Sequence, residues 1–178
     1  MIKRGKKAQG SSIGISFSTI FSIILIIFFL VIAFMVVRSF LKTRDCAKVG
    51  LFSDDFKETI DRAWNSQSDD YEFKSTLPTN VEFVCFANLS KSLRGDYENI
   101  GLDLSVYEGM ESNLFLYPIG SACNMEMYEI KHLDIEFITR SSNPFCVPVE
   151  DGVVRMRIIK LFNEGLVKIR EPKNQEIS

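Results

Sequence analysis

Residues 21–37 read FSIILIIFFLVIAFMVV, a run with no charged side chain and a single hydroxyl. The run extends back to Phe17, and in the 21 residues from Phe17 to Val37 only Ser18, Thr19 and Ser22 are not apolar. As an α-helix this segment is about 31 Å long, which matches a hydrocarbon core of about 30 Å. The alternative is a buried helix of a soluble protein, but a chain of 178 residues has little core to surround one. We therefore expect a single membrane-spanning helix.

The apolar run differs from a secretory signal that is cut away. Such signals have an apolar region of about 7 to 15 residues and a small-x-small cleavage site. Here the run is longer, and residues 36–40, VVRSF, offer no such site, so we expect the helix to be retained. The predicted organisation is a basic cytoplasmic leader (1–12), a transmembrane helix (13–38), a juxtamembrane connector (39–52), an extracytoplasmic domain (53–171) and a flexible tail (172–178).

Charge is distributed unevenly along the chain. Residues 1–44 hold seven basic side chains and no acidic one, whereas residues 45–178 hold 14 basic and 23 acidic side chains, a net charge of −9. Binding to nucleic acid requires a basic surface that displaces counterions from phosphates, so no nucleic-acid partner is expected. The acidic distal part should also be repelled by anionic bilayers. Membrane lipid is therefore expected to contact the apolar helix.

Four cysteines follow the apolar run, and none lies within or before it: Cys46, Cys85, Cys123 and Cys146. They contain no C-x-x-C pair, which argues against a zinc site or a thioredoxin-like motif. An even number of well-separated cysteines is typical of disulfides in an oxidising compartment. The basic residues on the two sides of the helix are nearly equal in number, so the cysteines decide the predicted orientation. We expect the N-terminus in the cytoplasm and the bulk of the chain outside the cell membrane.

Three disulfide connectivities are possible for four cysteines. We favour Cys46–Cys85, which would tie the connector to a strand, together with Cys123–Cys146. Asn88-Leu89-Ser90 is a glycosylation sequon, which makes Asn88 a candidate for modification on the same side of the membrane.

The part after the membrane helix is predicted to be an α+β domain with one helix and a mainly antiparallel sheet. Ser53 followed by two aspartates is typical of a helix start, and Phe56, Ile60, Ala63 and Trp64 form one apolar stripe on a helix that ends near Asn65. Alternating or apolar runs then predict strands in the following segments: 81–86, 113–117, 133–138, 153–162 and 166–170.

No catalytic, cofactor-binding or metal site is predicted. The single histidine, His132, has no recognisable nucleophile beside it, and the sequence lacks G-x-S-x-G, H-E-x-x-H and P-loop motifs. We expect His132 to be a surface residue and the protein not to be an enzyme.

Small residues recur along one side of the membrane helix. Gly14, Ser18 and Ser22 are spaced by four residues and so share a face, where a second helix could approach closely. The alternative is that these hydroxyls only bond back to their own backbone.

The N-terminus resembles the class III signal peptide of archaeal type IV pilin-like proteins. A short basic leader precedes Gln9, and small residues and a long apolar helix follow. The resemblance implies cleavage between Ala8 and Gln9 on the cytoplasmic side, and a helix that then serves as the assembly and anchoring element beneath a β-rich head. The family pattern after cleavage is Q-x-S-x-E, of which Gln9 and Ser11 match, whereas Ile13 occupies the glutamate position.

Two functions are consistent with these features. The first is a pilin-like cell-surface protein with a structural or assembly role, whose partners are membrane lipid and like subunits bound through the helix. The second is a monomeric anchored ectodomain that acts as an accessory or ligand-binding surface protein.

Overall fold

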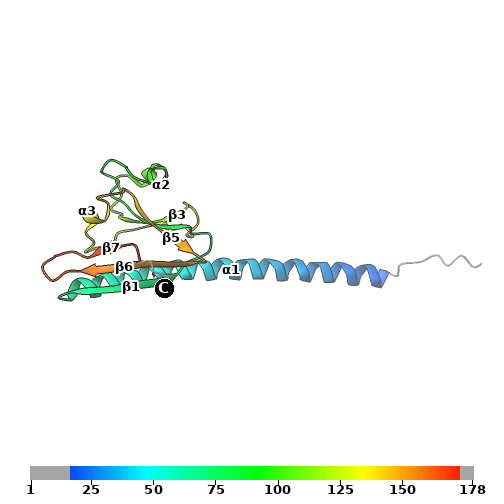
Figure 1. Ribbon diagram of the computed structural model, residues 1–178. Helices are drawn as coiled ribbons and strands as arrows, with labels where there is room; N and C mark the ends of the chain where they lie inside the picture. Colours follow the sequence, from blue (N-terminus) through cyan, green and yellow to red (C-terminus); the bar gives the residue numbers. More distant parts are fainter. Residues whose placement is uncertain (1–16, 173–178) are drawn as a thin grey trace, which may run out of the picture. The chain divides into compact units, whose positions relative to one another are not determined.

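The computed structural model describes residues 17–172. The chain forms two compact units, Met1–Leu41 and Lys42–Ser178. The first contains the apolar beginning of helix α1 (Phe17–Asn65), and the second contains the rest of α1 and a seven-stranded antiparallel sheet (Figure 1). The predicted α+β class, with one long apolar N-terminal helix, is confirmed.

Helix α1 continues without interruption for 49 residues. The predicted helix start at Ser53 was therefore wrong, and residues 39–52, predicted as a connector, are helical. Ser53 is only 4% exposed and lies within a buried stripe spaced by three and four residues. The stripe consists of Val49, Phe52, Ser53, Phe56, Thr59, Ile60 and Ala63. Burial of this face stabilises the helix through residues 49–56, where the local sequence favours the start of a new helix at Ser53. The glycine in the middle of the helix, Gly50, lowers the stability of the helix by about 1 kcal/mol relative to alanine.

The sheet is antiparallel at every strand pairing. The strand order is β1 (Asp69–Thr76), β6 (Val153–Lys160), β5 (Phe145–Glu150), β2 (Phe83–Phe86), β3 (Leu114–Tyr117) and β4 (Met127–Tyr128), with β7 (Lys168–Arg170) beside β6. One edge of β6 pairs with β1 from Asp69↔Lys160 to Thr76↔Val153, and its other edge pairs with both β5 and β7.

The main core lies between the second half of α1 and the sheet. The ring of Phe56 on α1 lies 5.3 Å from that of Phe73 on β1 and 5.9 Å from that of Phe86 on β2, measured between centroids. All three side chains are at most 7% exposed. Aromatic contacts of this kind stabilise beyond the area that they bury, so they hold the helix on the sheet.

Tyr71 on β1 makes a polar contact with α1. Its hydroxyl donates to the carbonyl oxygen of Thr59 at 3.2 Å. Burial, and secondly the carboxylate of Asp69, raises the pKa of Tyr71 above its ordinary value. The neutral phenol is thus the form that the folded domain favours.

A second, smaller core lies beneath helix α2 (Glu98–Leu104), which continues into the short 3₁₀ helix η1 (Ser105–Tyr107). Ile100 and Leu104 of α2 are buried there beside the two strand cysteines. Gly101 lies so close to Leu93 and Pro144 that a Cβ would be within 2.8 Å of carbon atoms of both side chains. A glycine is therefore required for this approach. At Gly50 in α1, by contrast, no neighbouring atom lies within 4 Å of such a Cβ.

The strand predicted over residues 133–138 was wrong, because residues Ile135–Ile138 form a short helix, α3. Asp134 caps it by accepting a hydrogen bond from the backbone N–H of Phe137 at 3.0 Å. Strands β1, β4 and β5 were not predicted, whereas the other predicted strands overlap β2, β3, β6 and β7.

Candidate functional site

The apolar part of α1 is the first candidate site. Between Phe17 and Leu41 its large apolar side chains are all exposed, from 39% at Leu25 to 83% at Phe17. Within residues 17–172, α1 is the one helix that is long and apolar enough to cross a membrane, judged by length and composition. Such an apolar surface is far more continuous than the patches found on soluble monomers. It is suited to membrane lipid or to other apolar helices.

The predicted small-residue face is described only in part. Ser22 donates its hydroxyl to the carbonyl oxygen of Ser18, 2.8 Å away on the preceding turn. This bond satisfies the Ser22 donor within its own helix. It agrees with the alternative interpretation, in which the serine hydroxyls bond to their own backbone and make no contact with a second helix. Gly14 and the predicted processing residues Ala8 and Gln9 lie outside the described residues.

Two disulfides join the four cysteines, but the favoured pairing was wrong. The bonds are Cys46–Cys123 and Cys85–Cys146, with Cα–Cα distances of 5.6 and 4.0 Å. Cys85 on β2 and Cys146 on β5 are direct partners in an antiparallel pair, so their side chains project from the same face of the sheet. Because this register pairs Cys85 with Cys146, the second disulfide joins the two remaining cysteines, Cys46 and Cys123.

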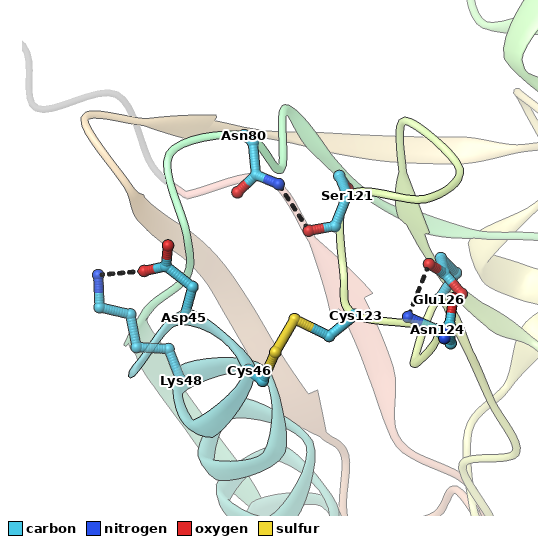
Figure 2. The surroundings of a disulfide bond; sticks show 8 residues. All are labelled: Asp45, Cys46, Lys48, Asn80, Ser121, Cys123, Asn124 and Glu126. Carbon is cyan, nitrogen blue, oxygen red and sulfur yellow. Dashed lines mark hydrogen bonds and ion pairs between the residues drawn. A yellow bond between two sulfur atoms is a disulfide. The ribbon is translucent and has the colours of Figure 1, made fainter. Parts of the chain in front are cut away.

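The bond between Cys46 and Cys123 joins α1 to the loop between β3 and β4 (Figure 2). It closes a segment with a sequence separation of 77 residues. The same loop is held by Asn80, whose side-chain amide donates to the carbonyl oxygen of Ser121 at 2.7 Å (Figure 2). The disulfide therefore links the helix to a loop that is already anchored to the domain.

Asn88, the predicted glycosylation site, is half-buried beside strand β2. Its amide nitrogen donates to Glu136 Oε1 at 3.2 Å, and its Oδ1 accepts from the backbone N–H of Ser90 at 3.2 Å. A hydrogen bond from the Lys91 ammonium is the main cause that holds the pKa of Glu136 below its usual range. A glycan on Asn88 would have to replace the contact with Glu136, and glycosylation stays a prediction.

The backbone at Asn88 is fixed by Asn143, a buried side chain at the start of the β5 segment. The Asn143 amide donates to the carbonyl oxygens of Asn88 and Ser92 at 2.9 and 3.2 Å, and its Oδ1 accepts from the N–H of Asn88 at 3.0 Å. Asn143 is 1% exposed. Its replacement by an apolar residue would remove all three of these hydrogen bonds.

His132 lies near the surface and stacks on Trp64. The two rings are 3.8 Å apart between centroids and inclined by 13°. The Trp64 indole donates to the carbonyl oxygen of Gly165 at 3.1 Å, and Trp64 itself is 40% exposed, so it is not the buried residue that the helical stripe predicted. These contacts join the end of α1 to the β4–α3 connection through His132 and to the β6–β7 connection through Gly165.

Within residues 17–172, no group of three or more histidine, cysteine, aspartate or glutamate side chains is arranged to hold a metal ion. No protein-family model, curated protein or solved structure matches the chain. The resemblance of the N-terminus to pilin-like proteins therefore stays a prediction.

Proposed function

We propose that this chain is a single-pass, membrane-anchored, pilin-like cell-surface protein with a structural or assembly role that it performs through its N-terminal helix. The observation that supports this most is the continuity of α1. One helix of 49 residues supplies an exposed apolar segment and then the buried stripe of the domain core. A helix of this kind suits an anchoring and assembly element that is also part of the head.

The chemistry of the domain supports a location outside the cytoplasm. Two disulfides close segments with sequence separations of 77 and 61 residues, and the described residues contain no free cysteine. Such bonds persist in oxidising compartments and are rare in the reducing cytosol. The proposed topology therefore has the N-terminus in the cytoplasm and the domain at the cell surface.

The second candidate is a monomeric anchored ectodomain with an accessory or ligand-binding role. It is favoured by Ile13, which stands where the pilin-like pattern has a glutamate that aids subunit registration. It is also favoured by the Ser22 hydroxyl, which is already bonded within its own helix.

Mass spectrometry of the N-terminus of the native protein tests the proposal. A mature chain that begins at Gln9 is expected, because the pilin-like route cleaves the Ala8–Gln9 bond. A chain that still begins at Met1 or Ile2 would contradict that route and leave the plain anchor.

Disulfide cross-linking of the full chain in its membrane tests the assembly role separately. With about 100° between successive residues, Ser18 and Ser22 share one side of α1 and Ile20 lies on the opposite side. If like subunits meet through the small-residue face, Ser18→Cys and Ser22→Cys should give cross-linked dimers and the matched control Ile20→Cys should not. Equal cross-linking at the three positions would contradict a specific helix contact.

A further inference from the structure

Three cationic side chains surround one aromatic ring at the junction of α3 and β7. The Phe137 ring centroid lies 5.2 Å from Arg140 Cζ, 4.2 Å from Lys168 Nζ and 5.4 Å from Arg170 Cζ. These distances are within the range of cation–π attraction. A cluster of three basic side chains is unusual in this part of the chain, because residues 45–178 carry a net charge of −9.

The two arginines of this cluster are available to a ligand. Lys168 is paired with Glu164. Arg140 and Arg170 are exposed, and neither forms an ion pair with any carboxylate of the described residues. A guanidinium that only stacks on a ring keeps its N–H donors free for a planar anion.

Both arginines are among the residues that line a surface groove of about 440 Å³. Phe137, Ile138, Phe145 and Ile169 supply its apolar lining, and Ser141 and Glu171 also line it. The groove lies where the sheet divides, since β7 pairs with β6 at residues 157–159 whereas β5 pairs with it at 153–154. Phe137 and Phe145 are half-buried there beside the two exposed arginines, whereas Ile138 and Ile169 form the buried floor.

We propose that this groove binds an acidic peptide segment of a partner protein, in which a carboxylate lies next to an aromatic or aliphatic side chain. The guanidiniums would bind the carboxylate, and the apolar lining would take the neighbouring side chain. Arginine and aromatic residues are the types that contribute most to protein interfaces. An open groove suits a peptide better than a small molecule, which usually requires an enclosing pocket. The acidic remainder of the domain repels such a segment, so charge directs it to the groove.

Fluorescence anisotropy of the full chain in detergent, with a labelled probe peptide, tests this proposal. The probe is acetyl-Glu-Phe-Asp-Leu-Glu-amide, and the control peptide carries Gln and Asn in place of the three acids. The binding variant is Arg140→Gln with Arg170→Gln, which keeps side-chain length at two exposed positions. The matched control variant is Arg62→Gln, an exposed arginine on α1 away from the groove residues.

The acidic probe should bind the wild-type protein saturably, and its affinity should fall as the salt concentration is raised. Its affinity for the double variant should be lower by about tenfold or more, because two charge-assisted contacts are removed. Arg62→Gln should bind it as the wild type does. The proposal is overturned if the uncharged peptide binds equally well, if the double variant binds as the wild type does, or if no binding is detected. Displacement of the probe by inorganic phosphate at equal concentration would show a bare anion site instead, and would also overturn it.

Discussion

Removal of the Cys46–Cys123 disulfide should destabilise the domain mainly through its unfolded state. The bond closes a segment with a sequence separation of 77 residues, for which the chain-entropy relation gives about 4.5 kcal/mol. Both cysteines are half-buried, so their replacement by alanine leaves little cavity. We expect the double variant Cys46→Ala with Cys123→Ala to lose about 4 kcal/mol of unfolding free energy.

The assay is urea unfolding of the full chain in detergent, followed by the fluorescence of Trp64, the single tryptophan. Its ring stacks on His132, so its emission reports whether the end of α1 stays attached to the rest of the domain. With a slope of roughly 2 kcal/mol per molar urea, the midpoint should fall by roughly 2 M.

The second disulfide provides the comparison. Cys85 and Cys146 are 0% exposed, and their bond has a sequence separation of 61 residues. The loss of unfolding free energy expected from chain entropy is about 4.3 kcal/mol, similar to that for the first disulfide. Replacement of these two cysteines by alanine also creates a cavity in the core. Cys85→Ala with Cys146→Ala should therefore cost more than the first double variant. A loss below about 1 kcal/mol for the first variant, or a larger loss for the first than for the second, would refute this reasoning.

Three further predictions concern single residues, and the same urea assay checks each of them. Asn143→Ala should cost about 2 to 3 kcal/mol because it removes three hydrogen bonds of a side chain that is 1% exposed. Asn80→Ala, which removes one hydrogen bond at the surface, should cost about 1 kcal/mol or less; equal costs for the two variants would contradict the role of burial. Gly101→Ala should destabilise by about 1 to 3 kcal/mol through overpacking, whereas Gly50→Ala should stabilise by up to about 1 kcal/mol; stabilisation by both would show that α2 is not closely packed. The raised pKa of Tyr71 means that the folded domain holds its proton more tightly than the unfolded chain does, so this contribution to stability is present below pH 10.0 and is lost as the pH rises through the folded pKa. Tyr71→Phe should cost about 1 kcal/mol at neutral pH and should reduce the alkaline loss of stability; an unchanged alkaline loss would contradict it.

The sequence was informative where the signal was local and long. The apolar run and the strands at residues 83–86, 114–117 and 153–160 follow from composition and periodicity. The start at Ser53 failed because a local capping pattern does not reveal that Phe52, directly before it, and Val49, one turn earlier, are buried in the domain core. The alternation over residues 133–138 failed because Asp134 caps a helical turn there.

The long-range features could not be predicted in the same way. The disulfide pairing depends on β5 lying beside β2 in a register that sets Cys85 opposite Cys146, and nothing near either cysteine in the sequence specifies this. The groove around Phe137 likewise combines Arg140 with Arg170, which lie on separate segments of the chain. The one local sign of the groove in the sequence is the presence of basic residues in an otherwise acidic domain.

Thiol labelling of intact cells decides whether the domain lies outside the cytoplasm. A membrane-impermeant maleimide is applied before and after an impermeant phosphine reductant, and labelled peptides are identified by mass spectrometry. We predict no labelling before reduction and labelling of the half-buried Cys46 and Cys123 after it. Cysteines that are labelled without reductant, and only after the cells are lysed, would place the domain in the cytoplasm and contradict the proposed topology.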